Sequence, residues 1–468
     1  MAADPENEAF DETYDVVVIG GGLAGHCAAI EAAEAGAQTL LIEQQAKVGG
    51  STVLSGGFFA FAGTPLQTQR GIADDGERLV QDLRTVGNFA NDPALLAVYA
   101  AHQLDLYRWL TSQGVTFEAV ELSAGQSVPR SHRTDAVVLI ETLQERLSRL
   151  PDAACWTGVG AKRLIRESLD GRVAGVAVER DARSIRLAAR RGVVLASGGF
   201  SRSEDLLQLF APNQARALRI GGAGNLGDGL KMAWHLGAGF RDMGYIKGTF
   251  GTHPDTGPDK HEILLAFYLG AIIVNKQGAR FVDESASYKT IGDACLAQDG
   301  QIGFQVFDQS VMDRSSPGVP LFDLAPQLEA GRLIRADSLT ELAKALDMDP
   351  ARLDETVATY NRAVDGEIAD PFGRDGLCHH SGALIRLERP PFYAYPSVSV
   401  VLATYCGLTV AADAAVQDVF GAPIAGLYAA GEITGGFHGA AYMTGSSLGK
   451  AALFGRLAGR NAASRMPS

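Results

Sequence analysis

The chain has 468 residues, of which 20% are charged and 46% hydrophobic, a length and composition typical of a globular protein with two domains. The formal net charge of -13 argues against a nucleic-acid partner, because phosphate binding requires a basic surface. The five cysteines are scattered without a CxxC pair, which favours a cytoplasmic protein and gives no support for a metal site. We expect no membrane span and no signal peptide, since residues 1–13 form an acidic tail and no apolar run reaches membrane-spanning length.

A nucleotide-binding pattern follows the tail. The apolar run from Val16 to Ile19 is typical of a buried parallel strand, and Gly20 to Gly25 form GxGxxG before an alanine-rich helix. A second apolar strand, Thr39 to Ile42, ends in Glu43. Glycines let the backbone approach a pyrophosphate, the helix start favours its negative charge, and Glu43 can bind a ribose hydroxyl. This order predicts a dinucleotide site; the alternative is a tight turn that binds nothing.

A second glycine cluster, GGSTVLSGG, follows directly at Gly49 to Gly57. A simple NAD domain does not need it, whereas FAD extends past the first turn toward its ring system. The cluster therefore favours FAD, and a glycine-rich surface loop is the alternative.

The middle of the chain alternates helix and strand signals. Residues 75–113 have helical apolar spacing, and residues 157–196 form strand-like segments with turns at Asp170-Gly171 and near Asp181. Between them, His132 and Arg133 are expected to be structural or solvated rather than ligand contacts. Asp228, at the start of a further helix, is either a helix-capping acid or a cofactor contact.

The character of the sequence changes at about residue 247, where glycines become fewer and prolines mark loops. We interpret residues 247–403 as a capping domain that supplies substrate contacts and excludes water. It would be inserted between two parts of an FAD-binding domain, residues 14–246 and 404–468. The sequence thus predicts an α/β protein with a Rossmann-like FAD-binding domain and an inserted α+β capping domain.

Several segments together resemble the flavoprotein family of fumarate reductase, succinate dehydrogenase and 3-ketosteroid dehydrogenase. They include VVVIGGGLAGHCAA, GGSTVLSGG, GAIIVNKQGARFVDES and GLYAAGEITGGFHGAAYMTGSSLGKAALFGRLAG, in family order. The resemblance implies that Glu432 binds the ribitol and that the helix after Gly445 points its start at the flavin. It implies FAD contacts from Gly20, Gly22, Leu23, Ala24, Glu43, Gln44, Gly49, Gly50, Ser51, Thr52, Ser55, Gly56, Gly57, Ala161, Ser197, Gly198, Asp228, Gly431, Glu432, Ser447 and Leu448. GGSTVLSGG holds no counterpart of the flavin-linking histidine of succinate dehydrogenases, so we expect FAD to be non-covalent.

The chain departs from the fumarate reductase pattern at the substrate-binding positions. Tyr288 stands where that branch has its proton-donating arginine, Thr404 where it has a histidine, and Tyr442 where it has a carboxylate-binding arginine. Its Thr-Glu pair is replaced by Ile263-Leu264, and only His253 is retained. A site without these cations would bind a dianion poorly. The replacements are closer to the 3-ketosteroid dehydrogenase branch, whose substrate is a neutral cyclic ketone.

The resemblance therefore implies a dehydrogenase that desaturates a cyclic ketone, either a 3-ketosteroid or a smaller oxocyclohexane compound. Tyr442 and the amide of Gly445 would polarise the carbonyl, Tyr288 would take the α proton, and the β hydride would pass to flavin N5. Additional substrate or proton-relay candidates are His253, Tyr268 and Tyr405. A half-buried tyrosine with a satisfied hydroxyl remains the alternative for each phenol. The electron acceptor is unknown.

Two other functions compete with this one. The first is a fumarate-reductase-like ene-reductase of an unsaturated carboxylate, in which Arg130, Arg133 or Arg386 substitutes for the missing arginines. The second is a flavin-binding protein without turnover. Bleaching of the flavin by cyclic ketones, or reoxidation of reduced flavin by enoates, would distinguish them.

Overall fold

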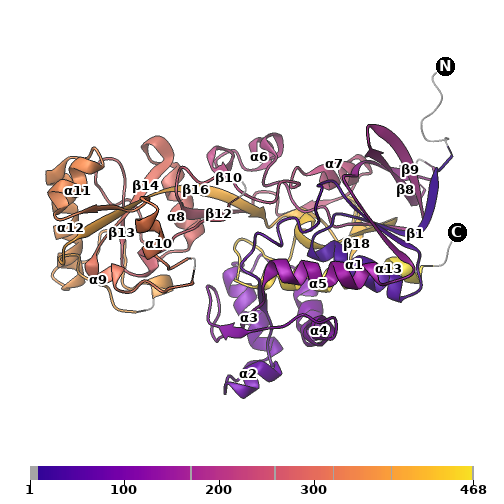
Figure 1. Cartoon of the computed structure of the whole chain (residues 1–468), viewed down its shortest axis with the longest axis horizontal. Coiled ribbons are helices and arrows are strands. Elements are labelled where there is room, and N and C mark those ends of the chain that lie inside the picture. The colour runs from indigo at the N-terminus through magenta and orange to yellow at the C-terminus, as the bar shows by residue number, and fades with distance from the viewer. Residues whose placement is uncertain (1–8, 169–170, 258–259, 320, 381, 466–468) are drawn as a thin grey trace. The chain divides into compact units, whose positions relative to one another are not determined.

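The computed structural model describes residues 9–168, 171–257, 260–319, 321–380 and 382–465 (Figure 1). Most of the acidic tail, residues 1–8, lies outside the described residues, as does Asp170 of one predicted turn. The chain forms two compact units. Unit 1 comprises residues 1–211, 221–247 and 403–468, and unit 2 comprises residues 212–220 and 248–402. The short segment 212–220, which the sequence analysis assigned to the FAD-binding domain, thus packs with unit 2.

Unit 1 is built on a largely parallel sheet in the strand order β18-β19-β9-β1-β2-β6. The strands β19, β9, β1, β2 and β6 pair in parallel, and β18 is antiparallel to β19. Val16 to Ile19 are buried on both faces of the sheet, which explains their continuous apolar run. The strands are β1 (Glu12–Ile19), β2 (Thr39–Glu43), β6 (Ala153–Thr157), β9 (Arg183–Leu195), β18 (Ala415–Gln417) and β19 (Pro423–Ala429). In addition, β8 (Val173–Arg180) pairs antiparallel with β9, and β7 (Gly160–Arg166) pairs antiparallel with β8.

The first and last helices of unit 1 pack closely against each other. Helix α1 (Leu23–Glu34) follows the GxGxxG turn, and α13 (Ser446–Ser464) ends the described chain. A Cβ atom at Gly459 would lie 2.1 Å from the carbonyl oxygen of Ala28, so the two backbones meet where a side chain cannot fit. Glu31 of α1 accepts hydrogen bonds from Arg456 and Arg460 of α13 beside this contact.

The remaining helices of unit 1 lie around this core. The predicted helical stretch 75–113 is two helices, because Asn88 and Phe89 adopt left-handed backbone angles between them. The elements are α2 (Pro65–Gln69), α3 (Gly76–Val86), α4 (Pro93–Ser112), α5 (Ala136–Ser148), α6 (Glu204–Phe210), α7 (Asp228–His235) and η5 (Gly431–Ile433). A small sheet joins β3 (Phe58–Ala60), β5 (Ser131–Arg133) and β4 (Ala119–Glu121), and β11 (Phe240–Arg241) pairs with β17 (Gly407–Leu408).

Unit 2 is an α+β body around a long strand, β16 (Phe392–Thr404). Its partners include β12 (Ile246–Thr252), β14 (Ile302–Asp308) and, beyond β14, β13 (Ile272–Val274), with β10 (Leu218–Arg219) and β15 (Ile334–Ala336) also paired to β16. The helices are α8 (Tyr288–Leu296), α9 (Gln309–Met312), α10 (Ala325–Glu329), α11 (Leu339–Ala345) and α12 (Pro350–Val364), with the short turns η1 (Gln214–Arg216), η2 (Ala266–Tyr268), η3 (Asp299–Gln301) and η4 (Cys378–His380). Helices α11 and α12 follow each other in the chain, and Asp349 caps α12 by accepting from the amide of Ala351. Phe267, Ile272 and Tyr395 are among the side chains of its hydrophobic core.

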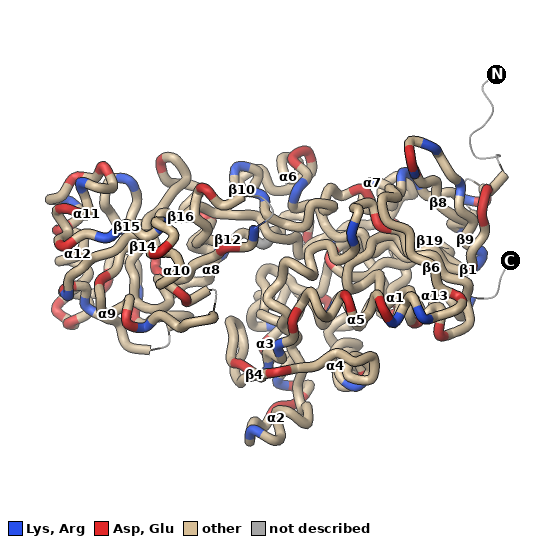
Figure 2. Tube along the Cα trace, in the orientation of Figure 1, with Lys and Arg blue, Asp and Glu red and all other residues tan. Residues whose placement is uncertain are grey.

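Charged residues of both signs are interspersed along both units, as Figure 2 shows. No helix in the described part of the chain is long and apolar enough to cross a membrane.

Candidate functional site

The GxGxxG turn joins β1 to α1 in unit 1. A Cβ atom at Gly25 would lie 1.8 Å from the carbonyl oxygen of Gly20, so the turn can close this tightly only around glycine. Gly22 is the N-cap of α1 and offers no side chain, and the amide of Leu23 in the first turn donates to Oγ1 of Thr52 at 3.2 Å. The first-turn amides of a helix have no partner within the helix and favour an anion. The turn is therefore suited to a pyrophosphate, as the sequence predicted.

Glu43 ends β2 beside this turn. One carboxylate oxygen accepts from the amide of Gly21 at 2.8 Å, and the other accepts from the amide of Gln45 at 2.8 Å. Each carboxylate oxygen can accept further hydrogen bonds, so Glu43 can hold the glycine turn and bind ribose hydroxyls together.

A pocket of about 340 Å³ lies next to the end of β2. Three residues that the resemblance assigned to FAD, Gln44, Ala161 and Asp228, come from separate segments and line it together. Asp228 is the first residue of α7, whose N-cap is Gly227, so it lines the pocket from the first turn of a helix. Asp228 is thus an acid in the first turn of α7 and not its N-cap, and its contact with the cofactor stays a prediction.

A polar network joins the second glycine cluster to the C-terminal segment. Glu432 is buried and accepts from the amide of Thr404 at 2.9 Å and from the side-chain amide of Asn225 at 3.1 Å. Asn225 also donates to the Oγ of Ser51 at 3.1 Å. Burial raises the pKa of Glu432 above its usual range, because its charged form is removed from water.

Asn225 is the functional candidate that the sequence analysis missed. It lies in the glycine-rich turn GGAGNLGDG before α7, and a lone asparagine in such a turn carries no signal of its role. It is separated from Ser51 by 174 positions and from Glu432 by 207. The other predicted FAD contacts also lie in unit 1: Gly49, Gly50 and Thr52, then Ser55, Gly56 and Gly57 before β3, Ser197 and Gly198 after β9, Gly431 at the start of η5, and Ser447 and Leu448 in the first turn of α13.

Tyr442 and Gly445 lie together ahead of α13. The amide of Gly445 donates to the hydroxyl oxygen of Tyr442 at 3.1 Å. The amide is thus directed at the phenol oxygen, and donation by the two groups to a substrate carbonyl stays a prediction. Burial raises the pKa of Tyr442, so its hydroxyl stays protonated at neutral pH and can donate.

Two further rings pack around Tyr442. The ring of Tyr405 is stacked on it, with centroids 6.0 Å apart and planes inclined by 13°. The ring of His438 contacts both, with centroids 5.6 Å from Tyr442 and 5.4 Å from Tyr405. We call Tyr405, His438 and Tyr442 the aromatic cluster. His438 was noted in the sequence motif but was not predicted as a site residue.

Thr404 does not fill the role of the histidine that it replaces. Its amide and its hydroxyl both bind the same carboxylate oxygen of Glu432, at 2.9 and 3.3 Å. It therefore orients a buried acid.

The other predicted tyrosines belong to unit 2. Tyr288 is half-buried and is the first residue of α8, directly after the N-cap Ser287. Tyr268 is buried in η2, and its hydroxyl donates to the carbonyl oxygen of Ala286 at 2.9 Å. The structure thus brings Tyr268 against the loop that precedes Tyr288. Burial raises the pKa of Tyr268, so this phenol is also protonated.

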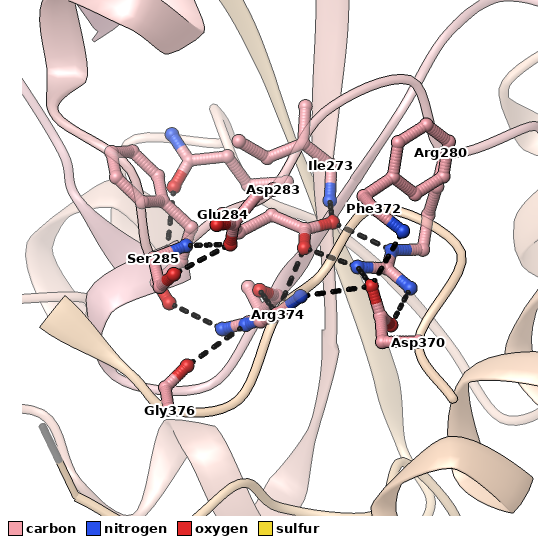
Figure 3. A network of polar contacts seen from close by, with 12 residues as sticks. Ile273, Arg280, Asp283, Glu284, Ser285, Asp370, Phe372, Arg374 and Gly376 are labelled. Carbon is pink, nitrogen blue, oxygen red and sulfur yellow. Dashed lines mark hydrogen bonds and ion pairs between the residues drawn. The ribbon is translucent and has the colours of Figure 1, made fainter. Parts of the chain in front are cut away.

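A buried ionic network, shown in Figure 3, holds the segments that carry these two tyrosines. Glu284 accepts from the Nε of Arg280 at 2.9 Å and from the amide of Ile273 at 3.0 Å. Arg374 donates to Glu284 at 3.3 Å, and Arg280 lies 2.5 Å from Asp370. Two guanidinium groups thus balance two carboxylates in the interior of unit 2.

Arg374 connects this network to the turn that contains Tyr268. Its guanidinium donates to the carbonyl oxygens of Phe267 at 2.9 Å and Ala271 at 3.0 Å. These carbonyls flank Tyr268 in the chain, so Arg374 fixes the backbone from which Tyr268 projects. Neither Arg374 nor Asp370 carried a recognisable signal in the sequence.

His253, the remaining substrate candidate, also lies in unit 2. Its Nδ1 accepts from the amide of Asp255 at 3.2 Å, and its ring lies 5.5 Å from that of Tyr395. Burial lowers the pKa of His253, which favours the neutral imidazole that this hydrogen bond requires.

The three arginines considered as carboxylate ligands are engaged elsewhere. Arg130 is fully buried, with its Nη2 2.9 Å from Asp74 and 3.1 Å from Asp82. Its neighbour His132 is also buried and bonds to the hydroxyl of Thr64 at 2.7 Å, which makes it structural as expected. Arg133 lies 3.8 Å from both Glu118 and Glu121, and Arg386 pairs with Asp365 and with Glu388.

Unit 1 contains a set of features that fits FAD: the glycine turn, Glu43, the adjoining pocket and the start of α13. The N-cap of α13 is Gly445, and the hydroxyl oxygen of Tyr442 interacts with the amides of Gly445 and Ser447 at this end of the helix. Two helix starts therefore offer partial positive charge, one for a pyrophosphate and one for an anionic ring.

Comparison with known proteins agrees with this fit. A model of the family described as an FAD binding domain matches residues 15–448. A fumarate reductase (cytochrome) of Shewanella frigidimarina is 33% identical over 97% of this chain and 77% of its own length. A urocanate reductase of Eggerthella lenta is 31% identical over 97% and 75%, and a vinyl phenol reductase of Lactiplantibacillus plantarum is 27% identical over 97% and 97%.

Two solved structures resemble the whole chain. The open conformation of a flavocytochrome c3 fumarate reductase matches with a TM-score of 0.85 and 28% identity, over 97% of this chain and 79% of its own. The 3-ketosteroid-Δ4-(5α)-dehydrogenase of Rhodococcus jostii RHA1 matches with a TM-score of 0.77 and 25% identity, over 98% of each chain. The chain therefore belongs to the FAD binding domain family, has the mixed α/β fold of the fumarate reductase flavoproteins, and is an FAD-dependent oxidoreductase acting on CH–CH groups.

Proposed function

We propose that this flavoprotein reduces a carbon–carbon double bond conjugated to a neutral carbonyl group. The named relatives are reductases, which supports the reductase alternative more than the cyclic-ketone dehydrogenase that the sequence analysis placed first. The choice of a neutral substrate rests on Tyr442. It presents a protonated hydroxyl, backed by the Gly445 amide, at the position of a carboxylate-binding arginine.

The aromatic cluster provides a chemical role for that hydroxyl. Addition to, or proton loss beside, a conjugated carbonyl places negative charge on its oxygen. Tyr442 donates to this oxygen, and the Gly445 N–H bond to the phenol oxygen makes the hydroxyl a stronger donor. One such donor contributes about 3 kcal/mol of transition-state stabilisation. Tyr405 stacks on the Tyr442 ring and limits its rotation.

FAD, when bound, supplies the two-electron redox chemistry of the reaction. In this proposal Tyr288 transfers the proton at the α carbon, giving it up in reduction and accepting it in the reverse direction. FAD is bound non-covalently through the turn at Gly20 to Gly25, Glu43 and the Glu432 network.

Desaturation of a cyclic ketone is the second candidate, favoured by the likeness to a ketosteroid dehydrogenase over 98% of both chains. It uses the same groups in the opposite direction. Reduction of an unsaturated carboxylate, the alternative given by the sequence, is favoured over desaturation by the likeness to fumarate and urocanate reductases. Against it, Arg130, Arg133 and Arg386 are all paired with acids.

Anaerobic flavin spectroscopy tests these candidates. Chemically reduced holoenzyme is mixed separately with cyclohex-2-enone, a steroid enone, fumarate and urocanate, and oxidised holoenzyme with the corresponding saturated ketones. The proposal expects rapid reoxidation by the neutral enones and little by the dianion. Bleaching by saturated ketones alone would establish the second candidate, and reoxidation by fumarate alone would reject a neutral substrate.

A further inference from the structure

Lys450 places an ammonium group in the interior of unit 1. It lies in α13, four positions after the first residue of that helix, and is only 2% exposed. Its Nζ donates to the carbonyl oxygen of Thr434 at 2.6 Å and lies 6.0 Å from the centroid of the Phe437 ring. Lysine is rarely buried to this extent, because removing its charge from water is costly.

The surroundings of Lys450 neutralise its charge only in part. An ammonium has three N–H donors, and among the described residues it has one hydrogen-bond acceptor, the carbonyl of Thr434. The titratable groups that interact with it are Glu432 of η5, Asp242 after β11 and the thiol of Cys406 before β17. Burial lowers the pKa of Lys450 to about 8, while these groups raise it. The ammonium is thus charged at neutral pH and able to stabilise further negative charge nearby.

The position of Lys450 connects it with the cofactor. It follows by one helical turn the start of α13, where the resemblance places Ser447 and Leu448 against the flavin. It also interacts with Glu432, the acid assigned to the ribitol. One helical turn rises by about 5.4 Å, so the backbone of Lys450 lies about that far along the helix axis from the start of α13.

We propose that Lys450 sets the reduction potential of the bound FAD by stabilising the negative charge that the flavin gains on reduction. A positive charge held in a medium of low dielectric acts on neighbouring charge with much less screening than in water. The inference rests on the family's cofactor and on its predicted contacts with α13, and it does not depend on the identity of the substrate.

The proposal predicts a particular pH dependence. Reduction makes the flavin more negative and so raises the pKa of Lys450, which means that reduction takes up an additional proton once the pH exceeds about 8. The potential of the wild-type protein therefore falls more steeply above pH 8 than below it. When Lys450 is neutral in both redox states, its contribution is lost.

The test is a potentiometric titration of the holoenzymes with chemical reductant from pH 6.5 to pH 10. Lys450→Met should lower the midpoint potential at pH 7, equivalent to about a tenfold loss in the equilibrium constant of flavin reduction. The difference from wild type should shrink above pH 8. Lys450→Arg keeps the charge and should stay close to wild type. Lys344→Met, which removes an exposed lysine from α11 of unit 2, is the matched control and should leave the potential unchanged.

An unchanged potential in Lys450→Met, or a shift that persists at pH 10, overturns the proposal. If Lys450→Met does not bind FAD, the wild-type titration still tests the proposal. A plot of wild-type midpoint potential against pH that does not become steeper above pH 8 would also overturn it. Because no substrate is involved, failure here is distinguishable from failure of the proposed reaction.

Discussion

The amide of Gly445 donates a 3.1 Å hydrogen bond to the hydroxyl oxygen of Tyr442, just before α13 begins. An accepted hydrogen bond draws electron density from the phenol oxygen, while burial keeps the phenol protonated. The Gly445 amide therefore strengthens the Tyr442 hydroxyl as a hydrogen-bond donor, and the phenolic proton is the one that a substrate would accept. Removing that proton is the most direct test of the site.

Tyr442→Phe should lower kcat by about 10²- to 10³-fold, the usual loss of one oxyanion-stabilising donor. The variant should keep its yellow colour, because the ring can still stack on Tyr405. Steady-state kinetics and the flavin spectrum measure the two effects. Tyr14→Phe is the control, since the Tyr14 hydroxyl bonds to Glu12 at the surface of unit 1. Turnover near the wild-type rate would remove Tyr442 from the mechanism.

Tyr288→Phe should separate proton transfer from redox chemistry. Loss of a general acid or base typically costs about 10²- to 10⁴-fold in rate. We expect substrate still to perturb the flavin spectrum on binding, while exchange of the α hydrogen with deuterated solvent stops. Undiminished exchange would show that another group handles the proton.

The nucleotide-binding half of the site was predictable because its signals are local. Gly20 to Gly25 and Glu43 lie on adjacent elements, and each residue type follows directly from strand, turn or ribose chemistry. Asn225 could not be found this way. Its function depends on contacts with Ser51 and Glu432, which are 174 and 207 positions away.

For the predicted substrate-binding residues, the sequence identified the residues themselves but not the groups to which they are hydrogen-bonded or paired. Tyr442 was identified from a motif position, but the direction of the Gly445 amide depends on the left-handed backbone at Gly445. Arg130 was a plausible carboxylate ligand in sequence, yet Asp74 and Asp82 pair with it in the interior. Ion pairs between distant segments leave no periodic pattern in the chain.

Asn225→Asp should weaken FAD binding. The substitution puts a second carboxyl group within hydrogen-bonding distance of buried Glu432, and like charges at this distance repel strongly. We expect at least about a tenfold increase in the FAD dissociation constant, measured by flavin fluorescence on dilution. Asn88→Asp is the matched control on an exposed turn of unit 1. Equal retention of FAD by both variants would exclude Asn225 from the cofactor site.

Acid precipitation should release all of the flavin into the supernatant. A covalent link to the flavin needs a nucleophilic side chain such as histidine or cysteine, and the segment Gly49 to Gly57 contains neither. The absorbance of the supernatant at flavin wavelengths, compared with that of the redissolved pellet, measures the distribution. Colour that remains with the pellet would show a covalent bond formed by another residue.

Arg374→Met should destabilise unit 2 and also disturb Tyr268. The substitution removes one of the two guanidinium partners of Glu284, while Arg280 remains, and leaves the carbonyls of Phe267 and Ala271 without their guanidinium donor. Breaking a buried ion pair from one side costs about 3 to 5 kcal/mol. We expect a fall in the melting temperature, measured by differential scanning calorimetry, because all three tryptophans lie in unit 1.

Two further variants separate stability from positioning. Arg362→Met removes a half-exposed arginine of α12 that pairs with Glu367, and it should change the melting temperature little. Arg374→Lys keeps the charge, but lysine lacks the planar guanidinium that donates to the carbonyls of Phe267 and Ala271 at the same time. If Arg374 fixes the Tyr268 turn, Arg374→Lys should raise KM or lower kcat at a temperature where the protein remains folded. Normal kinetics in that variant would mean that the network contributes stability alone.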